Sequence, residues 1–256
     1  MRERIMSDQK LAGKVALVTG SARNIGRAIA HQLADEGASI VVNAVSDQDA
    51  ADTVVSEIKA KGGNAIACLT NVTDVDAVNA MVARAKDELG GMDILVVNAS
   101  SRGQVPFLEM THAQWRNVLD ITLDGAFFCA QACLPSMKEA GWGRIVTLGG
   151  ISWHVGTSTR VHNLVSKSGL AGFTRGLAVE FAADGVTVNC VSPGFIDTVR
   201  PASAGVRPDH KINAPIDRMG TSDEIASMVR HLCLPESAYV TGQIMHVNGG
   251  LYLGGS

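Results

Sequence analysis

The chain has 256 residues, 46% of them hydrophobic, a length that is typical of one large domain. Its 22 Lys and Arg residues against 25 Asp and Glu residues give a formal net charge of −3, which is no electrostatic reason to expect nucleic acid or an anionic membrane as a partner. The sequence has no run near the roughly 18 consecutive apolar residues of a membrane-spanning helix. Its charged N-terminus also lacks the apolar segment of a secretory signal, so we expect a cytoplasmic protein.

Seven short apolar runs alternate with longer helical patterns almost to the end of the chain. Such runs are typical of strands that are covered on both faces, and the alternation indicates βαβ units around a parallel sheet. The predicted strands are Val15–Gly20, Ser39–Asn43, Asn64–Leu69, Asp93–Asn98, Arg144–Leu148, Val186–Val191 and Gln243–Val247. The predicted helices are Ile25–Glu36, Asp47–Lys61, Asp74–Leu89, Thr111–Lys138, Thr159–Ala183 and Ser222–Cys233, the last with the capping-box spacing of Thr221 and Glu224.

The pattern shows no repeat, linker or domain boundary. We therefore expect residues 1–12 to be an N-terminal tail and 13–256 to be one α/β domain with a doubly wound parallel sheet. The weakly patterned stretch near 199–213 is long enough to be a variable substrate loop.

The five cysteines are an odd number without a CxxC pair, which favours reduced thiols over a disulfide framework. Cys129 and Cys133 share a helix face, but no His or carboxylate nearby in the sequence completes a metal site. We interpret them as buried small hydrophobic residues and expect no metal.

A glycine-containing turn, TGSARNIG, follows the first strand and runs into the first helix. Free backbone amides and the helix dipole at such a place favour negative charge. The turn therefore indicates a site for the pyrophosphate of a dinucleotide, although a merely tight turn has the same composition.

The order of these segments resembles that of the short-chain dehydrogenase/reductase family from Gly13 to about Gly250. Thr19, Gly20 and Gly26 match the family's Thr-Gly-x3-Gly-x-Gly loop, in which Asn24 takes the place of the middle glycine. Asn tolerates a left-handed backbone better than most residues, so this change is compatible with binding. Further matches are Asn98-Ala99 with Ser100 after the fourth strand, the Asn-x3-Pro-Gly signature at Asn189, Pro193 and Gly194, and the C-terminal segment YVTGQIMHVNGG.

This resemblance implies a single-domain, Rossmann-type doubly wound α/β fold with about seven strands, helices on both faces and a nicotinamide dinucleotide cofactor. It assigns to the cofactor Gly20, Ala22, Arg23, Asn24, Ile25, Gly26, Ser46, Asn71, Val72, Asn98, Ala99, Ser100, Lys167, Pro193, Gly194, Ile196 and Thr198.

The residue at the end of the second predicted strand indicates a preference for NADP(H) over NAD(H). Members of the family that prefer NAD place an acidic residue there, and this chain has Ala44. Arg23 resembles the basic residue that many members pair with the 2′-phosphate, and Ser46 adds a hydroxyl. A solvated surface charge is the alternative interpretation of Arg23.

The catalytic positions depart from the family's pattern. The resemblance implies a Tyr-x3-Lys pair, a Ser thirteen residues before the Tyr and an Asn on the preceding long helix. Lys167 is present, but Asn163 stands at the Tyr position, Gly150 at the Ser position and Thr122 at the Asn position. An amide has no proton to donate at a useful pKa, and loss of a general acid typically costs about 10²- to 10⁴-fold in rate.

Two histidines are candidates for a replacement acid, because imidazole titrates near neutral pH. His154 lies four residues after Gly150, on the side that faces substrate in the family, and a loop or interface role is its alternative. His162 adjoins Asn163 but is offset by about 100° on the helix. Trp153 could stack on an aromatic substrate or serve only packing.

Three functions remain open at this point. The first is an NADP(H)-dependent oxidoreductase that acts on a carbonyl or hydroxyl compound with altered acid/base chemistry. The second is a catalytically impaired cofactor-binding regulator or pseudoenzyme subunit, and the third is a non-redox enzyme on the same fold.

The resemblance also implies self-association into a homotetramer through the helices near Thr111–Lys138 and Thr159–Ala183. We expect the only other partner to be a small-molecule substrate. Apolar residues expected on these two helices are Ala126, Phe127, Cys129, Ala130 and Ala171, some of which must face the sheet.

Overall fold

A computed structural model describes residues 9–199 and 214–254. Most of the expected tail at 1–12 and of the expected loop at 199–213 lies outside the described residues. Within them, seven strands form one sheet in the order β3-β2-β1-β4-β5-β6-β7, and every neighbouring pair is parallel. This confirms the predicted doubly wound α/β fold. The strands are β1 (Val15–Val18), β2 (Ser39–Ala44), β3 (Ala65–Leu69), β4 (Ile94–Val97), β5 (Gly143–Leu148), β6 (Val186–Pro193) and β7 (Ile244–Val247).

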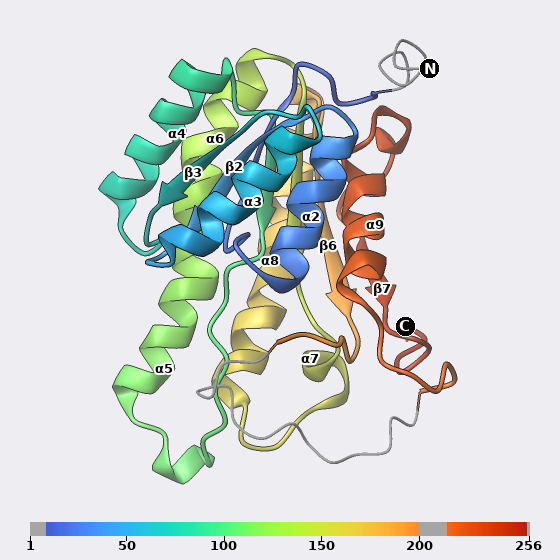
Figure 1. The fold of residues 1–256 in the computed structure, drawn as a ribbon. Helices are drawn as coiled ribbons and strands as arrows, with labels where there is room; N and C mark the ends of the chain where they lie inside the picture. Colours follow the sequence, from blue (N-terminus) through green and yellow to red (C-terminus); the bar gives the residue numbers. More distant parts are fainter. Residues whose placement is uncertain (1–8, 200–213, 255–256) are drawn as a thin grey trace.

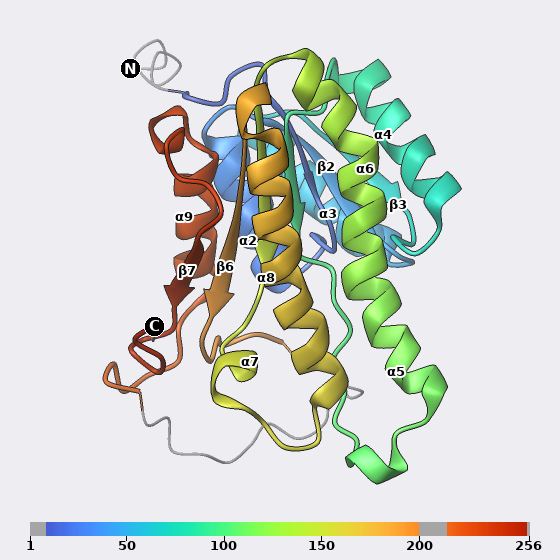
Figure 2. The ribbon, with the colours of Figure 1, turned by 180° about the vertical axis from the view of Figure 1, so that it is seen from behind.

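Helices cover both faces of the sheet (Figures 1 and 2). One face carries α2 (Asn24–Asp35), α3 (Gln48–Ala60) and α9 (Ser222–Cys233). The opposite face carries α4 (Val75–Leu89), α6 (Gly125–Glu139) and α8 (Val161–Phe181). Each face has its own buried cluster, and residues such as Ile29 and Leu170 are completely buried in them. The strands β1 and β4 at the middle of the sheet are apolar along their whole length because both of their faces are covered.

Local cap chemistry sets several helix starts. Asp47 accepts a hydrogen bond from the amide of Ala50 and so caps α3, and Asp74 caps α4 in the same way. The predicted capping box of Thr221 and Glu224 at the start of α9 is confirmed.

The predicted helix Thr111–Lys138 is confirmed as a continuous helical stretch, His112–Glu139, but its interior contains a wider turn that was not predicted. The chain there forms α5 (His112–Leu119), a π-helical turn (Asp120–Asp124) and then α6. A hydrophobic repeat follows 3.6 residues per turn and does not reveal one wider turn, although such turns are frequent at functional sites. The short helix α7 (Ser152–Val155) was also not predicted, because four residues are too few to show a period.

The stretch His112–Glu139 is, by length and composition, apolar enough to cross a membrane. Half of its most apolar window is buried inside the fold, as in a core helix, so this is weak evidence for a membrane span.

Candidate active site at the carboxyl end of the sheet

All seven strands are parallel, so the segments that follow them meet at one edge of the sheet. The turn after β1 and the loop after β4 are joined there by Thr19, whose Oγ1 accepts hydrogen bonds from the amides of Asn98 and Ala99, both at 3.0 Å. The Asn98 Nδ2 donates in return to the carbonyls of Thr19 and Gly20 at 2.9 and 3.1 Å. These bonds fix the glycine-containing turn against the loop after β4.

Asn43 at the end of β2 supports the same turn from the other side. Its Oδ1 accepts from the Gly20 amide at 3.0 Å, and its Nδ2 donates to the Thr70 carbonyl at 2.9 Å. Asn43 is 1% exposed, so these bonds are made away from water. The sequence analysis did not single out Asn43, because its strand position resembled that of any other buried strand residue.

The turn requires glycine at two positions. Gly20 has a φ of +63°, in the left-handed region. A Cβ on Gly26 would lie 2.5 Å from the Gly20 carbonyl oxygen and 2.6 Å from the Asn98 Nδ2, so only glycine fits. Asn24, at the position of the family's middle glycine, has a φ of +51°, and its side chain exchanges two hydrogen bonds with the backbone of Val199 at 2.9 and 3.0 Å. This ties the turn to the segment after β6.

The turn fits a pyrophosphate. Helix α2 begins within it, at Asn24, without a side-chain cap and without an acidic residue in its first turn. Its first amides are therefore left for an anion, in contrast to those of α3, α4 and α9, which carry Asp or Thr caps.

The end of the site that would meet a 2′-phosphate carries both a basic and an acidic side chain. Ala44 is buried and Ser46 is exposed beyond it. The Arg23 Nη2 lies 3.0 Å from Oδ2 of Asp47, and the two side chains are 61% and 42% exposed. Although Ala44 replaces the acidic residue at the end of the strand, the α3 cap brings another carboxylate, that of Asp47, beside Arg23.

The remaining residues assigned to the cofactor lie at the same edge. Val72 is buried beneath Gly125, while Asn71 is exposed and its Oδ1 accepts from the amide of Thr73 at 3.2 Å. After β6, the Pro193 carbonyl accepts from the Ile151 amide at 2.8 Å, and Gly194 packs against the backbone of Asn248. Other assigned residues at this edge are Ala22, Ile25, Ser100, Ile196 and Thr198.

Lys167 on α8 is the buried charged group of this edge. It is 9% exposed, and its Nζ donates to the Leu148 carbonyl at the end of β5 at 2.6 Å. Burial, with a smaller contribution from the positive charge of Arg102, lowers the pKa of Lys167 to about 8, although the nearby Cys190 acts in the opposite direction. No carboxylate of the described residues forms an ion pair with it.

The three other positions that the family uses carry no titratable side chain. Asn163, one turn before Lys167, donates from Nδ2 to the Ser101 carbonyl at 3.3 Å. A Cβ on Gly150 would meet nothing within 4 Å, so the space beside that residue is open. Thr122 lies in the π-helical turn, is 0% exposed, and its Oγ1 has no hydrogen-bond partner in the described structure.

His154 is held in an aromatic cluster. Its ring centroid lies 3.6 Å from that of Trp153, 4.6 Å from that of His246 and 4.4 Å from that of Tyr252. Burial, with a smaller contribution from His246, lowers the pKa of His154. His162 is 1% exposed, and burial lowers its pKa as well. The contacts of His154 with β7 and the C-terminal segment were not foreseen, because they join residues about 90 positions apart.

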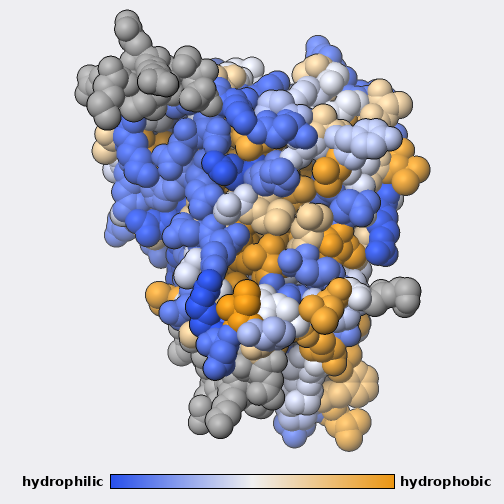
Figure 3. Space-filling view, turned by 90° about the vertical axis from the view of Figure 1, so that its right-hand side faces the viewer, coloured by the Kyte–Doolittle hydropathy of each residue, from blue (hydrophilic) through white to orange (hydrophobic). Residues whose placement is uncertain are grey.

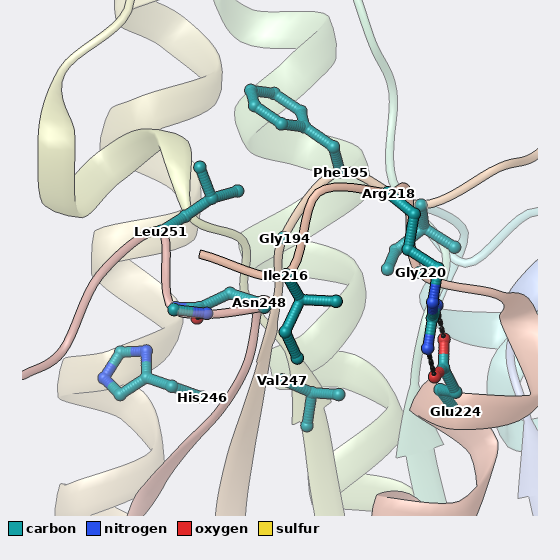
Figure 4. Close-up of a pocket in the computed structure, with 13 residues that line it drawn as sticks. Gly194, Phe195, Ile216, Arg218, Gly220, Glu224, His246, Val247, Asn248 and Leu251 are labelled. Atoms are coloured by element: carbon teal, nitrogen blue, oxygen red, sulfur yellow. Dashed lines mark hydrogen bonds and ion pairs between the residues drawn. The ribbon is translucent and has the colours of Figure 1, made fainter. Parts of the chain in front are cut away.

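A cavity of about 270 Å³ lies on the β7 side of the segment after β6 (Figure 4). Its wall includes Gly194 and Ile196, both assigned to the cofactor, and the ion pair of Arg218 with Glu224 at 2.6 Å. The pair raises the polarity of one wall, while His246 lies at the opposite end of the cavity in Figure 4.

Comparison with known proteins gives consistent results. The family model described as enoyl-(acyl carrier protein) reductase matches residues 20–252. The 3-oxoacyl-[acyl-carrier-protein] reductases FabG of Staphylococcus aureus and Aquifex aeolicus are each 38% identical, over 94% and 95% of this chain and 98% and 99% of theirs. The crystal structure of a putative short-chain alcohol dehydrogenase from Sinorhizobium meliloti superposes with a TM-score of 0.88 at 36% identity, covering 95% of this chain and 98% of that one.

Proposed function

The chain belongs to the short-chain dehydrogenase/reductase family, and we propose that it is an NADP(H)-dependent oxidoreductase of a carbonyl or hydroxyl compound with altered acid/base chemistry. The observation that carries the proposal is the turn after β1. Its left-handed Gly20, its close-packed Gly26 and the uncapped start of α2 together form an anion site that a merely tight turn does not need.

Different residues of this chain bind and orient different parts of the cofactor. The turn after β1 binds the pyrophosphate, and Arg23 pairs with the 2′-phosphate. Lys167 holds the nicotinamide ribose from the base of the site. The nicotinamide, when bound, supplies or accepts the hydride. The residues at the positions where the family contacts the substrate carbonyl, Gly150 and Asn163, carry no acid.

Altered acid/base chemistry follows from these positions. Asn163 is an amide and Gly150 has no side chain, so neither donates a proton to a developing alkoxide. On the substrate side, His154 is the candidate for a replacement general acid. It can act as one only if its ring leaves the contacts with Trp153 and Tyr252. The 3-oxoacyl thioesters named for the relatives are ketones and fall within the proposed substrate class.

A second function, cofactor binding without turnover, is favoured by one contact. The amide of Asn163 is engaged with the Ser101 carbonyl, which is a structural role and not a catalytic one. In that case the chain is a cofactor-binding regulator or a subunit of a mixed oligomer.

The protein also presents two apolar faces that suit a homotetramer, since a tetramer with D2 symmetry uses two different interfaces. On the outer sides of α6 and α8, side by side in Figure 2, Phe127 is 48% and Val179 is 84% exposed. The second face is the edge strand β7, which is half-buried throughout and which, among the described residues, pairs with β6 alone. Apolar side chains gather around it in Figure 3. Of the five apolar residues expected at the helices, Ala126, Cys129, Ala130 and Ala171 face the core instead. We assign this assembly to the cytoplasm.

The test is titration of the purified protein with NADPH and NADH, followed by oxidation of NADPH with a panel of ketones. Tighter binding of NADPH with turnover supports the oxidoreductase. Binding without turnover supports the second function, and no binding of either cofactor contradicts both.

A further inference from the structure

The buried ammonium of Lys167 has an unusual set of neighbours. Its Nζ donates to the Leu148 carbonyl. Of the two ionisable neighbours that act on its pKa, Cys190 raises it and the cation Arg102 lowers it, and burial raises the pKa of the Cys190 thiol itself. A buried charge is stabilised by a partner of opposite sign, and a neutral carbonyl satisfies only one of the three ammonium hydrogens. The surroundings of Lys167 therefore favour a ligand that carries negative charge.

Open space lies beside the segment that follows the Leu148 carbonyl, to which this ammonium donates. Gly150 is two residues beyond Leu148, and a Cβ on it would meet nothing within 4 Å. Asn163, one helical turn before Lys167, is turned toward the Ser101 carbonyl. Two neighbouring positions thus leave room, and neither of them brings a group that can give up a proton.

This inference rests on the proposed function. We propose that the substrate itself supplies the missing acid: it is a ketone with an acidic hydroxyl group, a phenol or an enol, beside its carbonyl, and that hydroxyl occupies the space between Gly150 and Asn163, next to Lys167. The positive charge of Lys167 stabilises the phenolate or enolate that remains after the hydroxyl has given its proton.

The step balances within the named reactants. The carbonyl carbon receives a hydride from NADPH, which is oxidised, and the carbonyl is reduced by two electrons. The carbonyl oxygen takes the proton of the neighbouring hydroxyl and becomes an alcohol. The phenolate or enolate left behind pairs with the ammonium of Lys167 and is reprotonated by solvent on release.

The first experiment compares two isomers, 2′-hydroxyacetophenone and 4′-hydroxyacetophenone, as substrates with NADPH. Only the first places the hydroxyl beside the carbonyl. We expect it to be reduced about 100-fold faster, the lower end of what a general acid contributes. In Asn163→Tyr with Gly150→Ser, which brings its own phenol, this preference should disappear. Equal rates for the two isomers in the natural protein would overturn the proposal.

The second experiment measures binding and does not depend on turnover. 4-Nitrophenol ionises near neutral pH with a change in visible absorbance, so a titration of it against the protein reports its charge when bound. We expect its pKa to fall by about one unit on binding, which corresponds to tenfold preference for the phenolate. Lys167→Met should abolish this shift, and Lys61→Met, which changes an exposed lysine far from the site, should not.

A second variant covers the case in which Lys167→Met fails to fold. Gly150→Leu fills the open space without changing the charge, and it should weaken nitrophenol binding at least tenfold. If nitrophenol binds without a pKa shift, or binds Gly150→Leu unchanged, while NADPH still binds, the inference is wrong and the proposed function stands. If NADPH does not bind, the proposed function fails, whatever nitrophenol does.

Discussion

Arg23 and Asp47 form an ion pair of 3.0 Å between the turn after β1 and the start of α3, at the place where a 2′-phosphate would lie. Both side chains are substantially exposed, so the pair contributes about 0–1 kcal/mol and opens readily. Arg23 is therefore available to a phosphate, but to bind it the guanidinium must give up its contact with the Asp47 carboxylate. The carboxylate that makes this exchange necessary also caps α3 through the amide of Ala50.

Replacement of Asp47 by Asn should strengthen the preference for NADP(H). The amide keeps an oxygen for the cap, while the competing negative charge disappears. We expect NADPH to bind several-fold more tightly, roughly 1 kcal/mol, with little change for NADH. Calorimetric titration of both cofactors measures this. Asp74→Asn, which makes the same change at the cap of α4, is the control and should leave both affinities unaltered.

Arg23→Ala provides the opposite test of the same site. Loss of the guanidinium should remove most of the advantage of NADPH over NADH, because Arg23 is the basic residue assigned to the 2′-phosphate. An unchanged ratio of the two dissociation constants would show that Arg23 is only a solvated surface charge.

Lys167 gives a prediction for the pH dependence of stability. Its pKa is about 8 in the folded protein and about 10.4 in an unfolded chain, so between these values the unfolded chain binds more protons. The free energy of unfolding should therefore rise with pH across this window, by up to roughly 3 kcal/mol from this group. Below pH 8, Lys167 is protonated in both the folded and the unfolded chain. Its contribution to the free energy of unfolding is then constant and at its least favourable value.

Denaturant unfolding of the natural protein and of Lys167→Met between pH 7.5 and 10.5 measures this effect. The difference between the two curves isolates the contribution of Lys167 from that of the other titratable groups. A difference that does not vary with pH would contradict the lowered pKa.

In the same variant, cofactor affinity should fall by about 1–3 kcal/mol, the scale of a lost charge-assisted hydrogen bond.

Self-association should depend on the exposed apolar residues of α6 and α8. We expect Phe127→Asp with Val179→Asp to lower the mass measured by light scattering, because a buried unpaired charge is costly at an interface. Leu108→Asp changes a residue that is 96% exposed outside these helices, and it should have no effect. A natural protein of 26.8 kDa at micromolar concentration would contradict the tetramer itself.

The sequence predicted the sheet well because buried parallel strands are short apolar runs, and their alternation with helical patterns indicates βαβ units in a parallel sheet. It also identified Asn24 as a residue able to replace a glycine, and its φ of +51° agrees with the reason given. These predictions depend on properties of one residue or of one short segment, which a sequence displays directly.

Other features depend on residues that meet only after folding. Asn43 supports the turn after β1 from the neighbouring strand, 23 residues away, and nothing in its local pattern marks that role. Asp47 has the local signature of a helix cap, and its second contact, with Arg23, requires the two loops to be adjacent. His154 looked available as an acid because its partners His246 and Tyr252 lie at the far end of the chain.

The last prediction is that reduction of ordinary ketones is weak in the natural protein and is partly recovered by design. Asn163→Tyr places a phenol on the helix face of Lys167, and Gly150→Ser enters open space. Because such groups act as a unit, each change alone should do little, while the pair should raise NADPH-dependent turnover of 4′-hydroxyacetophenone by about 10²-fold or more. Thr122→Asn is added separately, since Thr122 is completely buried and a larger side chain there costs about 1–3 kcal/mol of stability. If the natural protein instead turns over ordinary ketones rapidly and His154→Ala abolishes this, the histidine is the acid. Rapid turnover that survives both His154→Ala and His162→Ala would contradict the whole assignment of the site.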